Sequence, residues 1–301
     1  MREEFIKSID NKKIFIRIWD EVDAPKGVVQ IFHGMAEHSE RYNDFALYLN
    51  SKGYIVYADD HRGHGKSKDS NGYGYLGNNG FYSVVEDEGN ITKLIKERYN
   101  ELPIYIFAHS FGSFVGQEYI TKFSDKISGV ILSGSAKQDG IDVKFGRVFA
   151  NIQSKLIGDS KPAHFIDKMS FGSFNKKVNN PKSKFDWLTR DDKEVNKYKD
   201  DSFCGFVSPI NFYTSMFEGL HNLYNPDKLS KINKKLSIFV LSGDKDPVGK
   251  YGKSVERLFN QYKDLGIHDV SLKLYDGGRH EMLNETNKEE VYTDIYNWLS
   301  K

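Results

Sequence analysis

Short apolar runs of β-favouring residues alternate along this chain with longer segments that place apolar residues at helical spacing. Helical patterns near Tyr42 to Lys52 and near Phe81 to Tyr99 each follow such a run, and the alternation resumes late in the chain. This order predicts a mostly parallel central sheet with helices on both faces. The strand-like runs are 28–32, 54–58, 104–107, 129–133, 236–241 and 270–275.

The two ends of the chain complete this pattern. Near the start, the runs 5–8 and 13–19 flank Asp10-Asn11, which is a turn signal, so we expect an antiparallel hairpin there. Near the end, residues 291–299 have the spacing of a closing helix.

The segment from Lys137 to Asn225 breaks the alternation. It contains no convincing strand, it is dense in Lys, Asn, Ser and Asp, and its apolar residues fall into short helical groups. A structureless loop of this length is uncommon inside a compact domain, so an inserted helical unit is the better prediction. We therefore expect an α/β core of residues 1–136 and 226–301, interrupted by a helical insertion at 137–225.

Composition narrows the class of protein. The 43 Lys and Arg residues nearly balance the 42 Asp and Glu residues, so the net charge of +1 gives no reason to expect a nucleic-acid partner. The single cysteine, Cys204, excludes an intrachain disulfide. The first residues show no apolar signal segment and no run is long enough to span a membrane, so a cytoplasmic location is the default expectation.

The segment Ala108-His109-Ser110-Phe111-Gly112 joins a strand-like run to a helical pattern. A serine at such a tight turn, with small residues two positions before and after it, looks like a nucleophile elbow. Ala108 stands where glycine is usual, which keeps the small volume but gives up freedom at positive φ. Because a buried serine in such a turn is common without any catalytic role, this motif alone does not decide the chemistry.

Chain order adds the partners that a nucleophilic serine needs. A base must take the serine proton and a carboxylate must orient that base, in the order serine, acid, histidine for this kind of turn. Asp244 and Asp246 follow one strand-like run, and His280 follows the next. Taken singly, the aspartates fit a polar turn that caps a helix and His280 fits a surface loop. Together with Ser110 they favour a catalytic triad at the carboxyl ends of parallel strands.

With these residues the chain resembles the α/β-hydrolase superfamily. Within it, the similarity is to the monoacylglycerol lipase and lysophospholipase-like branch, of the serine aminopeptidase S33 type. The resemblance covers almost the whole chain, and Ala108 is its one mild departure. The motifs that carry it are His33–His38, Asp60–Gly65, Ala108–Gly112, Gly243–Val248 and His280.

The resemblance implies an α/β-hydrolase fold with a helical cap, or lid, over the active site. It also implies a role for each motif residue. Ser110 would attack an acyl carbonyl, His280 would take its proton and pass it to the leaving alcohol, and Asp246 would orient His280. Asp246 is preferred to Asp244 because the acid of the family follows the glycine by three positions.

The oxyanion hole needs two backbone donors. We expect them to be the amides of Phe111, directly after the nucleophile, and of Met35, after the strand-ending His33-Gly34. Glu37 and Arg41 stand four residues apart and have two interpretations. They are either an exposed ion pair worth at most about half a kcal/mol, or, as the family implies, residues near the polar head of the substrate.

Several histidines precede or accompany the expected site. His38, His61 and His109 lack the pairwise helical spacing of a metal motif, so we expect no metal and no other cofactor. The segment 60–65 is expected to be structural, with glycines that permit turns and with Arg62 and His64 bracing neighbouring loops.

The function that this reading predicts is a serine carboxylic-ester hydrolase that forms an acyl-enzyme. The expected partner is a small-molecule or lipid ester, such as a monoacylglycerol or a lysophospholipid, with transient contact between the cap and a membrane surface as a further option. Within the insertion, residues 185–191 resemble a segment found in caps of this branch.

Two other functions remain open. A peptidase that removes an N-terminal residue would use the same triad, and it would need an acidic anchor in the cap, such as Asp186, Asp191 or Asp192. A non-catalytic binding protein would usually have lost a triad member. Dehalogenases and epoxide hydrolases share the fold but use an aspartate nucleophile, so Ser110 argues against both.

Overall fold

The computed structural model describes all 301 residues, and its eight strands form one sheet in the order β1-β2-β4-β3-β5-β6-β7-β8. The first two strands and the β2–β4 pair are antiparallel, and every pair from β4 to β8 is parallel. The predicted sheet is therefore confirmed. The strands are β1 (Arg2–Lys7), β2 (Lys13–Trp19), β3 (Gly27–Phe32), β4 (Tyr54–Asp60), β5 (Ile104–His109), β6 (Gly129–Ser133), β7 (Ser237–Gly243) and β8 (Asp269–Tyr275).

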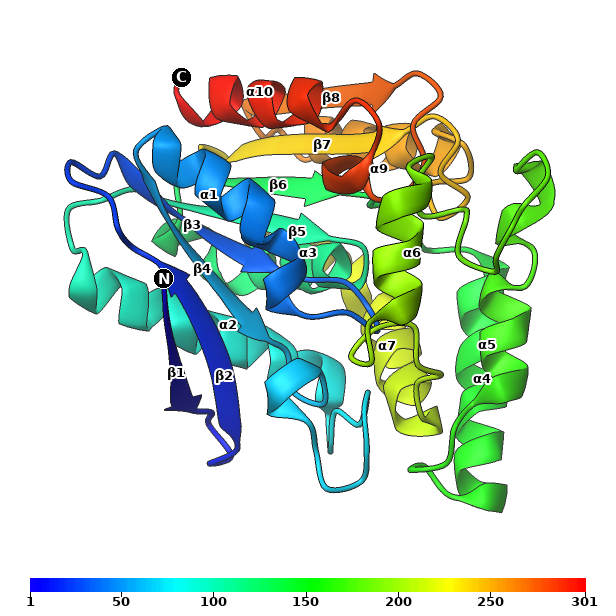
Figure 1. Ribbon diagram of the computed structural model, residues 1–301. Helices are drawn as coiled ribbons and strands as arrows, with labels where there is room; N and C mark the ends of the chain where they lie inside the picture. Colours follow the sequence, from blue (N-terminus) through cyan, green and yellow to red (C-terminus); the bar gives the residue numbers. More distant parts are fainter.

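Helices cover both faces of this sheet (Figure 1). One apolar core lies between the sheet and α2, α3 and α9, and a second lies between the sheet and α1 and α10. Neighbouring side chains on β3 alternate between them, with Val28 in the first core and Val29 in the second, as strand geometry requires. The core helices are α1 (Asn43–Ser51), α2 (Gly80–Arg98), α3 (Phe111–Phe123), α9 (Lys253–Asp264) and α10 (Lys288–Leu299).

The predicted N-terminal hairpin is also present. Lys7 pairs with Lys13 at the end of β1 and β2, and Asn11 in the turn between them has a φ of 61°, a conformation that asparagine tolerates. β1 is the edge strand and is largely exposed, whereas β3 is buried along its whole length. A strand buried on both faces is nearly all apolar in sequence, and Gln30 is the one polar residue of β3.

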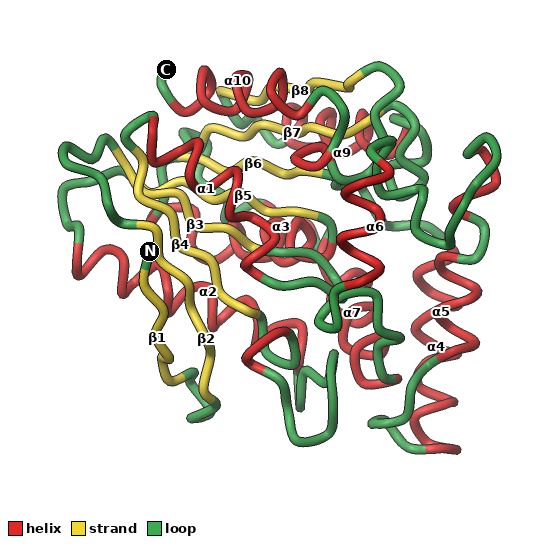
Figure 2. Tube along the Cα trace, in the orientation of Figure 1, coloured by secondary structure: helices red, strands yellow, loops and turns green.

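The chain between β6 and β7 contains helices and no strand, as the break in the sequence pattern predicts (Figure 2). α4 packs along α7, and α7 in turn contacts α2 and α3 of the core. The division into a core and a cap at residues 137 and 225 stays a prediction. The helices here are α4 (Ile141–Ile157), α5 (His164–Phe171), α6 (Asp192–Asp200), α7 (Ile210–Leu223) and α8 (Pro226–Leu229).

Short 3₁₀ turns complete the chain at 39–42, 65–67, 124–126, 174–177 and 282–284. The segment 60–65 braces its surroundings as expected, because the buried Arg62 forms ion pairs with Asp87 and Asp10. None of the helices combines the length and the apolar character that crossing a membrane requires.

Candidate active site

Ser110 lies at the turn between β5 and α3 in a strained backbone conformation. Its φ of 52° and ψ of −119° are rare for a residue with a side chain, and such strain costs on the order of 1–3 kcal/mol. The Ser110 amide donates a hydrogen bond of 3.0 Å to the carbonyl of Ser133, which stabilises the turn. At Gly112 a Cβ atom would lie 2.3 Å from the carbonyl oxygen of Phe32, so the need for a small residue there is confirmed.

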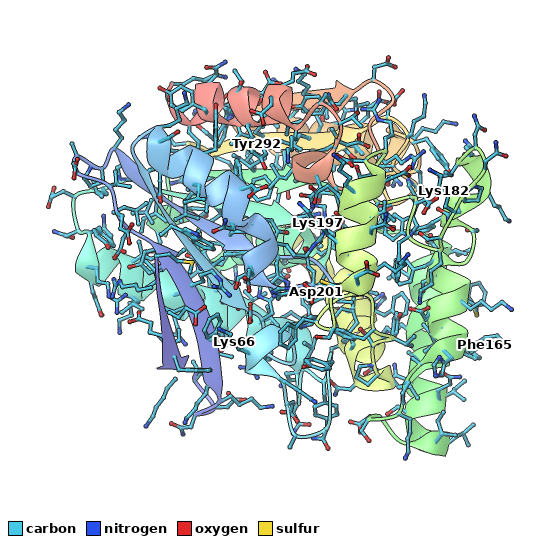
Figure 3. All side chains as sticks on the ribbon, viewed as in Figure 1. Lys66, Phe165, Lys182, Lys197, Asp201 and Tyr292 are labelled. Atoms are coloured by element: carbon cyan, nitrogen blue, oxygen red, sulfur yellow. The ribbon has the colours of Figure 1, made fainter.

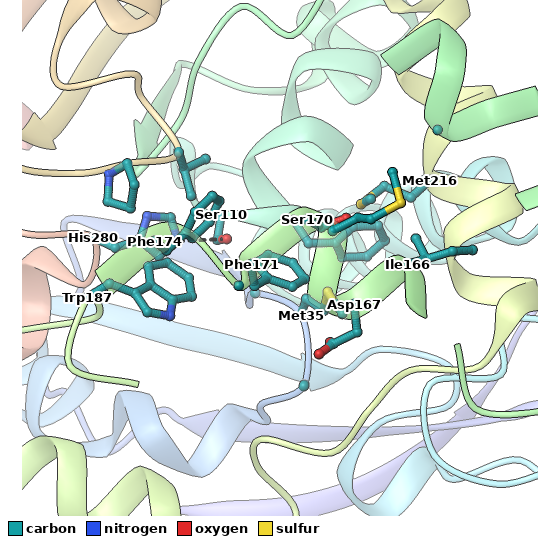
Figure 4. Close-up of a pocket in the computed structure, with 18 of the residues that line it drawn as sticks. Met35, Ser110, Ile166, Asp167, Ser170, Phe171, Phe174, Trp187, Met216 and His280 are labelled. Carbon is teal, nitrogen blue, oxygen red and sulfur yellow. Dashed lines mark hydrogen bonds between the residues drawn. The ribbon is translucent and has the colours of Figure 1, made fainter. Parts of the chain in front are cut away.

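The structure brings Ser110, His280 and Asp246 together through consecutive hydrogen bonds. Ser110 Oγ lies 2.8 Å from His280 Nε2 (Figure 4). On the other side of the ring, His280 Nδ1 lies 2.9 Å from Asp246 Oδ2. The amide of Val248 and the hydroxyl of Ser242 donate to the Asp246 carboxylate at 2.8 and 2.9 Å. The competing residue Asp244 instead pairs with Lys245 on the surface, so its carboxylate has no contact with His280.

Burial and neighbouring charge shift the pKa values of His280 and Asp246 in opposite directions. Burial by itself would lower the pKa of His280, but the Asp246 carboxylate raises it above its ordinary value of 6.5. For Asp246, burial would raise the pKa, but His280 and the two donors lower it below 3.8. Asp246 is therefore ionised near neutral pH and fixes His280 with Nδ1–H toward the carboxylate and Nε2 toward Ser110.

The two expected oxyanion donors lie beside Ser110. Phe111 is the first residue of α3, so its N–H has no acceptor within the helix. The amide of Met35 donates no hydrogen bond to any protein group. A Cβ atom on Gly34 would lie 3.2 Å from Ser110 Cβ, which shows how closely the loop before Met35 approaches the nucleophile. Met35, Phe111 and Ser110 all line the same cavity.

The interpretation of Glu37 and Arg41 as an exposed ion pair is wrong. Glu37 is 3% exposed, and the Arg41 guanidinium lies between the carboxylates of Glu37, at 2.5 Å, and Glu281, at 2.7 Å. Arg41 holds the pKa of Glu281 at about 2, despite the burial that acts to raise it. Glu37 lines the cavity that contains Ser110, whereas Arg41 does not and lies behind Glu37. Sequence reasoning missed Glu281, although its place directly after His280 is a signal.

Two groups of side chains are close enough together to share a metal ion: His33, Asp59 and His61, and His38, Asp201 and Cys204. In the first group, His33 Nδ1 donates to the carbonyl of Gly34 and His33 Nε2 accepts the amide of His61, which leaves that ring no free lone pair. In the second group, burial raises the pKa of the Cys204 thiol far above its ordinary value. A protonated thiol is a poor metal ligand, so neither donor set fits a metal well.

A cavity of about 610 Å³ lies between the core and the insertion and contains the Ser110–His280 pair. Of the 37 residues that line it, 20 are hydrophobic, which suits an apolar ligand. The ring of Trp187 lies over the His280 ring with centroids 5.0 Å apart (Figure 4). Sequence reasoning singled out residues 185–191 but did not place Trp187 against the histidine.

The aspartates considered as a peptidase anchor do not face this cavity. Asp186 accepts hydrogen bonds from residues 182 and 183 of its own loop, Asp191 caps α6, and Asp192 pairs with Lys182 on the surface. The carboxylate that lines the cavity from α5 is Asp167, whose Oδ1 accepts a hydrogen bond of 3.0 Å from the Tyr213 hydroxyl.

Comparison with known proteins shows the family of this chain. The profile of the family described as serine aminopeptidase, S33, matches residues 23–287. The chain belongs to this family of α/β-hydrolases. It is 26% identical to a monoacylglycerol lipase of Mycolicibacterium smegmatis, over 99% of this chain and 96% of that protein. It is also 24% identical to human monoglyceride lipase, over 97% of this chain and 88% of that protein.

A solved structure shows the same fold. The chain is similar to a thermostable carboxyl esterase from Bacillus coagulans, solved with glycerol, with a TM-score of 0.91 and 30% identity. That match covers 99% of this chain and 97% of the esterase. This S33-family protein is therefore a hydrolase enzyme, and the α/β-hydrolase fold expected from the sequence is confirmed.

Proposed function

We propose that this protein is a serine carboxylic-ester hydrolase that works through Ser110, His280 and Asp246. The observation that carries the proposal is the continuous hydrogen-bonded chain from Ser110 Oγ through His280 to the buried Asp246 carboxylate. His280 takes the proton of Ser110 as Oγ attacks the ester carbonyl, and then gives that proton to the leaving alcohol. Water, deprotonated by the same histidine, releases the acid from the acyl-enzyme.

The amides of Met35 and Phe111 receive the negative charge that develops on the carbonyl oxygen. Both donors lie beside Ser110 and neither has an acceptor within the protein. Donors of this kind need no rearrangement during the reaction, and losing one typically costs on the order of 10²–10³ in turnover. Main-chain donors survive side-chain substitution, so their effect is tested through the groups that hold them.

The proposed substrates are monoacylglycerols or lysophospholipid-like esters. An apolar cavity of about 610 Å³ is large enough for an acyl chain, and Glu37 adds a polar group to its wall beside the nucleophile. The lipase relatives and the esterase with glycerol favour the same substrate class. No cofactor is needed for this chemistry.

We also propose transient contact of α4 and α5 with a lipid surface. Eight of the twelve large hydrophobic side chains that are exposed lie on these two helices, and Phe165 points outward from α5 (Figure 3). Residues 141–184 carry nine lysines and arginines against three aspartates, a net charge of +6 in a chain of net charge +1. An apolar face among basic residues suits an anionic lipid surface.

An aminopeptidase is the second candidate. The observation that favours it is Asp167, a carboxylate on the cavity wall that forms no ion pair and could hold a free amine. A non-catalytic binding protein is the weakest candidate because Ser110, His280 and Asp246 are all present and in contact.

The test compares wild type with Ser110→Ala on p-nitrophenyl esters of graded chain length, 1-monoacylglycerols and aminoacyl-nitroanilides. We expect ester turnover in the wild type and a loss of at least 10³-fold in the variant. Ser208→Ala is the matched control, because that buried hydroxyl has no hydrogen-bond partner. Turnover of anilides alone would support the peptidase, and an active Ser110→Ala would refute the serine mechanism.

A further inference from the structure

Residues 33–38, which we call the oxyanion loop, carry the proposed donor Met35, so the inference below rests on the proposed function. Two side chains of the loop itself hold its first part. His33 Nδ1 donates to the carbonyl of Gly34 at 2.7 Å, which fixes the peptide that ends in the Met35 N–H. The Gly34 amide donates to Glu37 Oε1 at 2.5 Å.

The second part of the loop is held from the insertion instead. Ala36 has a φ of 53°, in the left-handed region that a residue with a Cβ atom adopts at a cost of roughly 1–2 kcal/mol. Its carbonyl oxygen accepts two hydrogen bonds, both of 3.0 Å, from the Tyr198 hydroxyl and from the Gly205 amide. Tyr198 lies on α6 and Gly205 in the segment that follows, so nothing from the core supplies these donors.

The Tyr198 ring is itself fixed. It is 7% exposed, the Arg41 guanidinium lies 4.7 Å from its centroid, and Phe185 packs edge-on at 5.0 Å. Burial raises the pKa of the phenol far above its ordinary value, so the hydroxyl keeps the proton that it donates. A rigid donor on a buried ring is well suited to hold a strained carbonyl in one orientation.

We propose that Tyr198 is a positioning residue for the oxyanion hole, so that α6 is part of the catalytic machinery and not only of the cover. The Tyr198 hydroxyl and the Gly205 amide together keep Ala36 in its left-handed conformation, and Ala36 is the residue directly after the oxyanion donor Met35. Without the hydroxyl, only the Gly205 amide still holds the Ala36 carbonyl, so Ala36 relaxes toward an unstrained conformation. Met35 is then held firmly only from the His33 side, and its N–H aligns less well with the carbonyl oxygen of the substrate.

The test is Tyr198→Phe, assayed on a short soluble ester with active sites counted by a fluorophosphonate probe. We expect kcat per active site to fall about tenfold, which is the effect of one hydrogen bond on the transition state, with KM within about twofold of wild type. Tyr54→Phe is the matched control. Tyr54 is the first residue of β4, and its buried hydroxyl also donates to a backbone carbonyl, that of Leu299, at 2.9 Å.

Two inhibitors separate positioning from a merely structural role. A trifluoromethyl ketone adds to Ser110 and places an anionic oxygen in the hole, whereas a 1-O-alkylglycerol ether fills the cavity without a carbonyl. Tyr198→Phe should weaken the ketone by about the same factor as kcat and leave the ether unchanged. Equal weakening of both, or an unchanged kcat, would overturn the proposal.

A second variant tests the same proposal if Tyr198→Phe lowers the stability of the protein. Glycine adopts a positive φ without steric cost, so Ala36→Gly in the Tyr198→Phe background should recover part of the lost kcat. Absence of any recovery would indicate a simple structural contact. Failure of the proposed function looks different, because an active Ser110→Ala enzyme would be insensitive to every variant of the oxyanion loop.

Discussion

The insertion has two halves that differ in how they are held. The proximal half, residues 185–223, is tied to the core next to the triad: the carbonyl of Leu188 accepts the Glu281 amide at 2.7 Å, and Asp201 bonds His38 at 2.8 Å. The distal half, residues 141–184, carries eight of the twelve exposed large apolar side chains, and its helix α4 packs on α7 (Figure 1). The proximal half therefore belongs to the active site, and the distal half covers the cavity and faces outward.

The difference indicates which half of the insertion can open at low free energy. A segment with many buried polar contacts opens only with a large part of the fold, whereas one with an exposed apolar face and few such contacts opens at low free energy. Residues that position chemistry need the first kind of support, and a gate for an apolar substrate needs the second. The predictions below separate the two halves.

The largest effect is expected where the core holds the triad. Asp246→Asn should lower kcat by on the order of 10⁴-fold, because the amide holds the imidazole in the wrong tautomer. Asp244→Asn, in the same loop but facing Lys245, is the control and should stay within about twofold. If Asp244→Asn were the damaging substitution, the assignment of the acid would be wrong.

The same group sets the pH dependence. His280 must be neutral to act as a base, and its pKa is raised, so activity is lost as pH falls through a value above 6.5. The acid limb of kcat/KM should therefore have its midpoint above 6.5 in wild type. A midpoint below 6.5 would contradict the influence of Asp246 on His280.

A smaller effect is expected from two arginines, one packed beneath the proximal half and one within the distal half. Arg41 belongs to the core and lies 4.7 Å from the Tyr198 ring of the proximal half, whereas Arg147 lies on α4. Arg41→Met leaves the buried carboxylates of Glu37 and Glu281 without their cation, and should lower the free energy of unfolding by about 3–5 kcal/mol. Arg147→Met removes the half-exposed pair of α4 with Glu218 and should cost at most about 1 kcal/mol. Chemical denaturation of both variants at pH 7 measures the contrast, and equal losses would remove the distinction between the halves.

Acid should reduce the Arg41 difference. The pKa of Glu281 is about 2 in the folded protein against 4.5 for the free side chain, so the stability it contributes is complete above about 4.5 and is lost as pH falls toward 2. Wild type and Arg41→Met should therefore converge in stability over this range.

Much of the core could be predicted from the sequence because each buried strand is a continuous apolar run and each catalytic candidate follows such a run. Ser110, Asp246 and His280 were recognisable since their order and local context constrain one another. The interpretation of Arg41 as exposed failed because the spacing of four residues from Glu37 does not reveal the second partner. That partner, Glu281, lies 240 positions further along the chain. Tyr198 was missed for the same reason, since only the folded insertion brings its hydroxyl to Ala36.

The smallest effect is expected on the distal face. Val148 and Leu156 are 58% and 77% exposed and do not line the cavity, so replacing both with serine should leave stability within about 0.5 kcal/mol of wild type and leave turnover of a short soluble ester unchanged. Turnover of a monoacylglycerol in anionic vesicles should fall several-fold, because less apolar surface reaches the lipid. Leu47→Ser, which removes a 52% exposed leucine from α1, is the control and should affect neither substrate. An equal loss on both substrates would mean that the distal half shapes the catalytic site itself, and the division between the two halves would not hold.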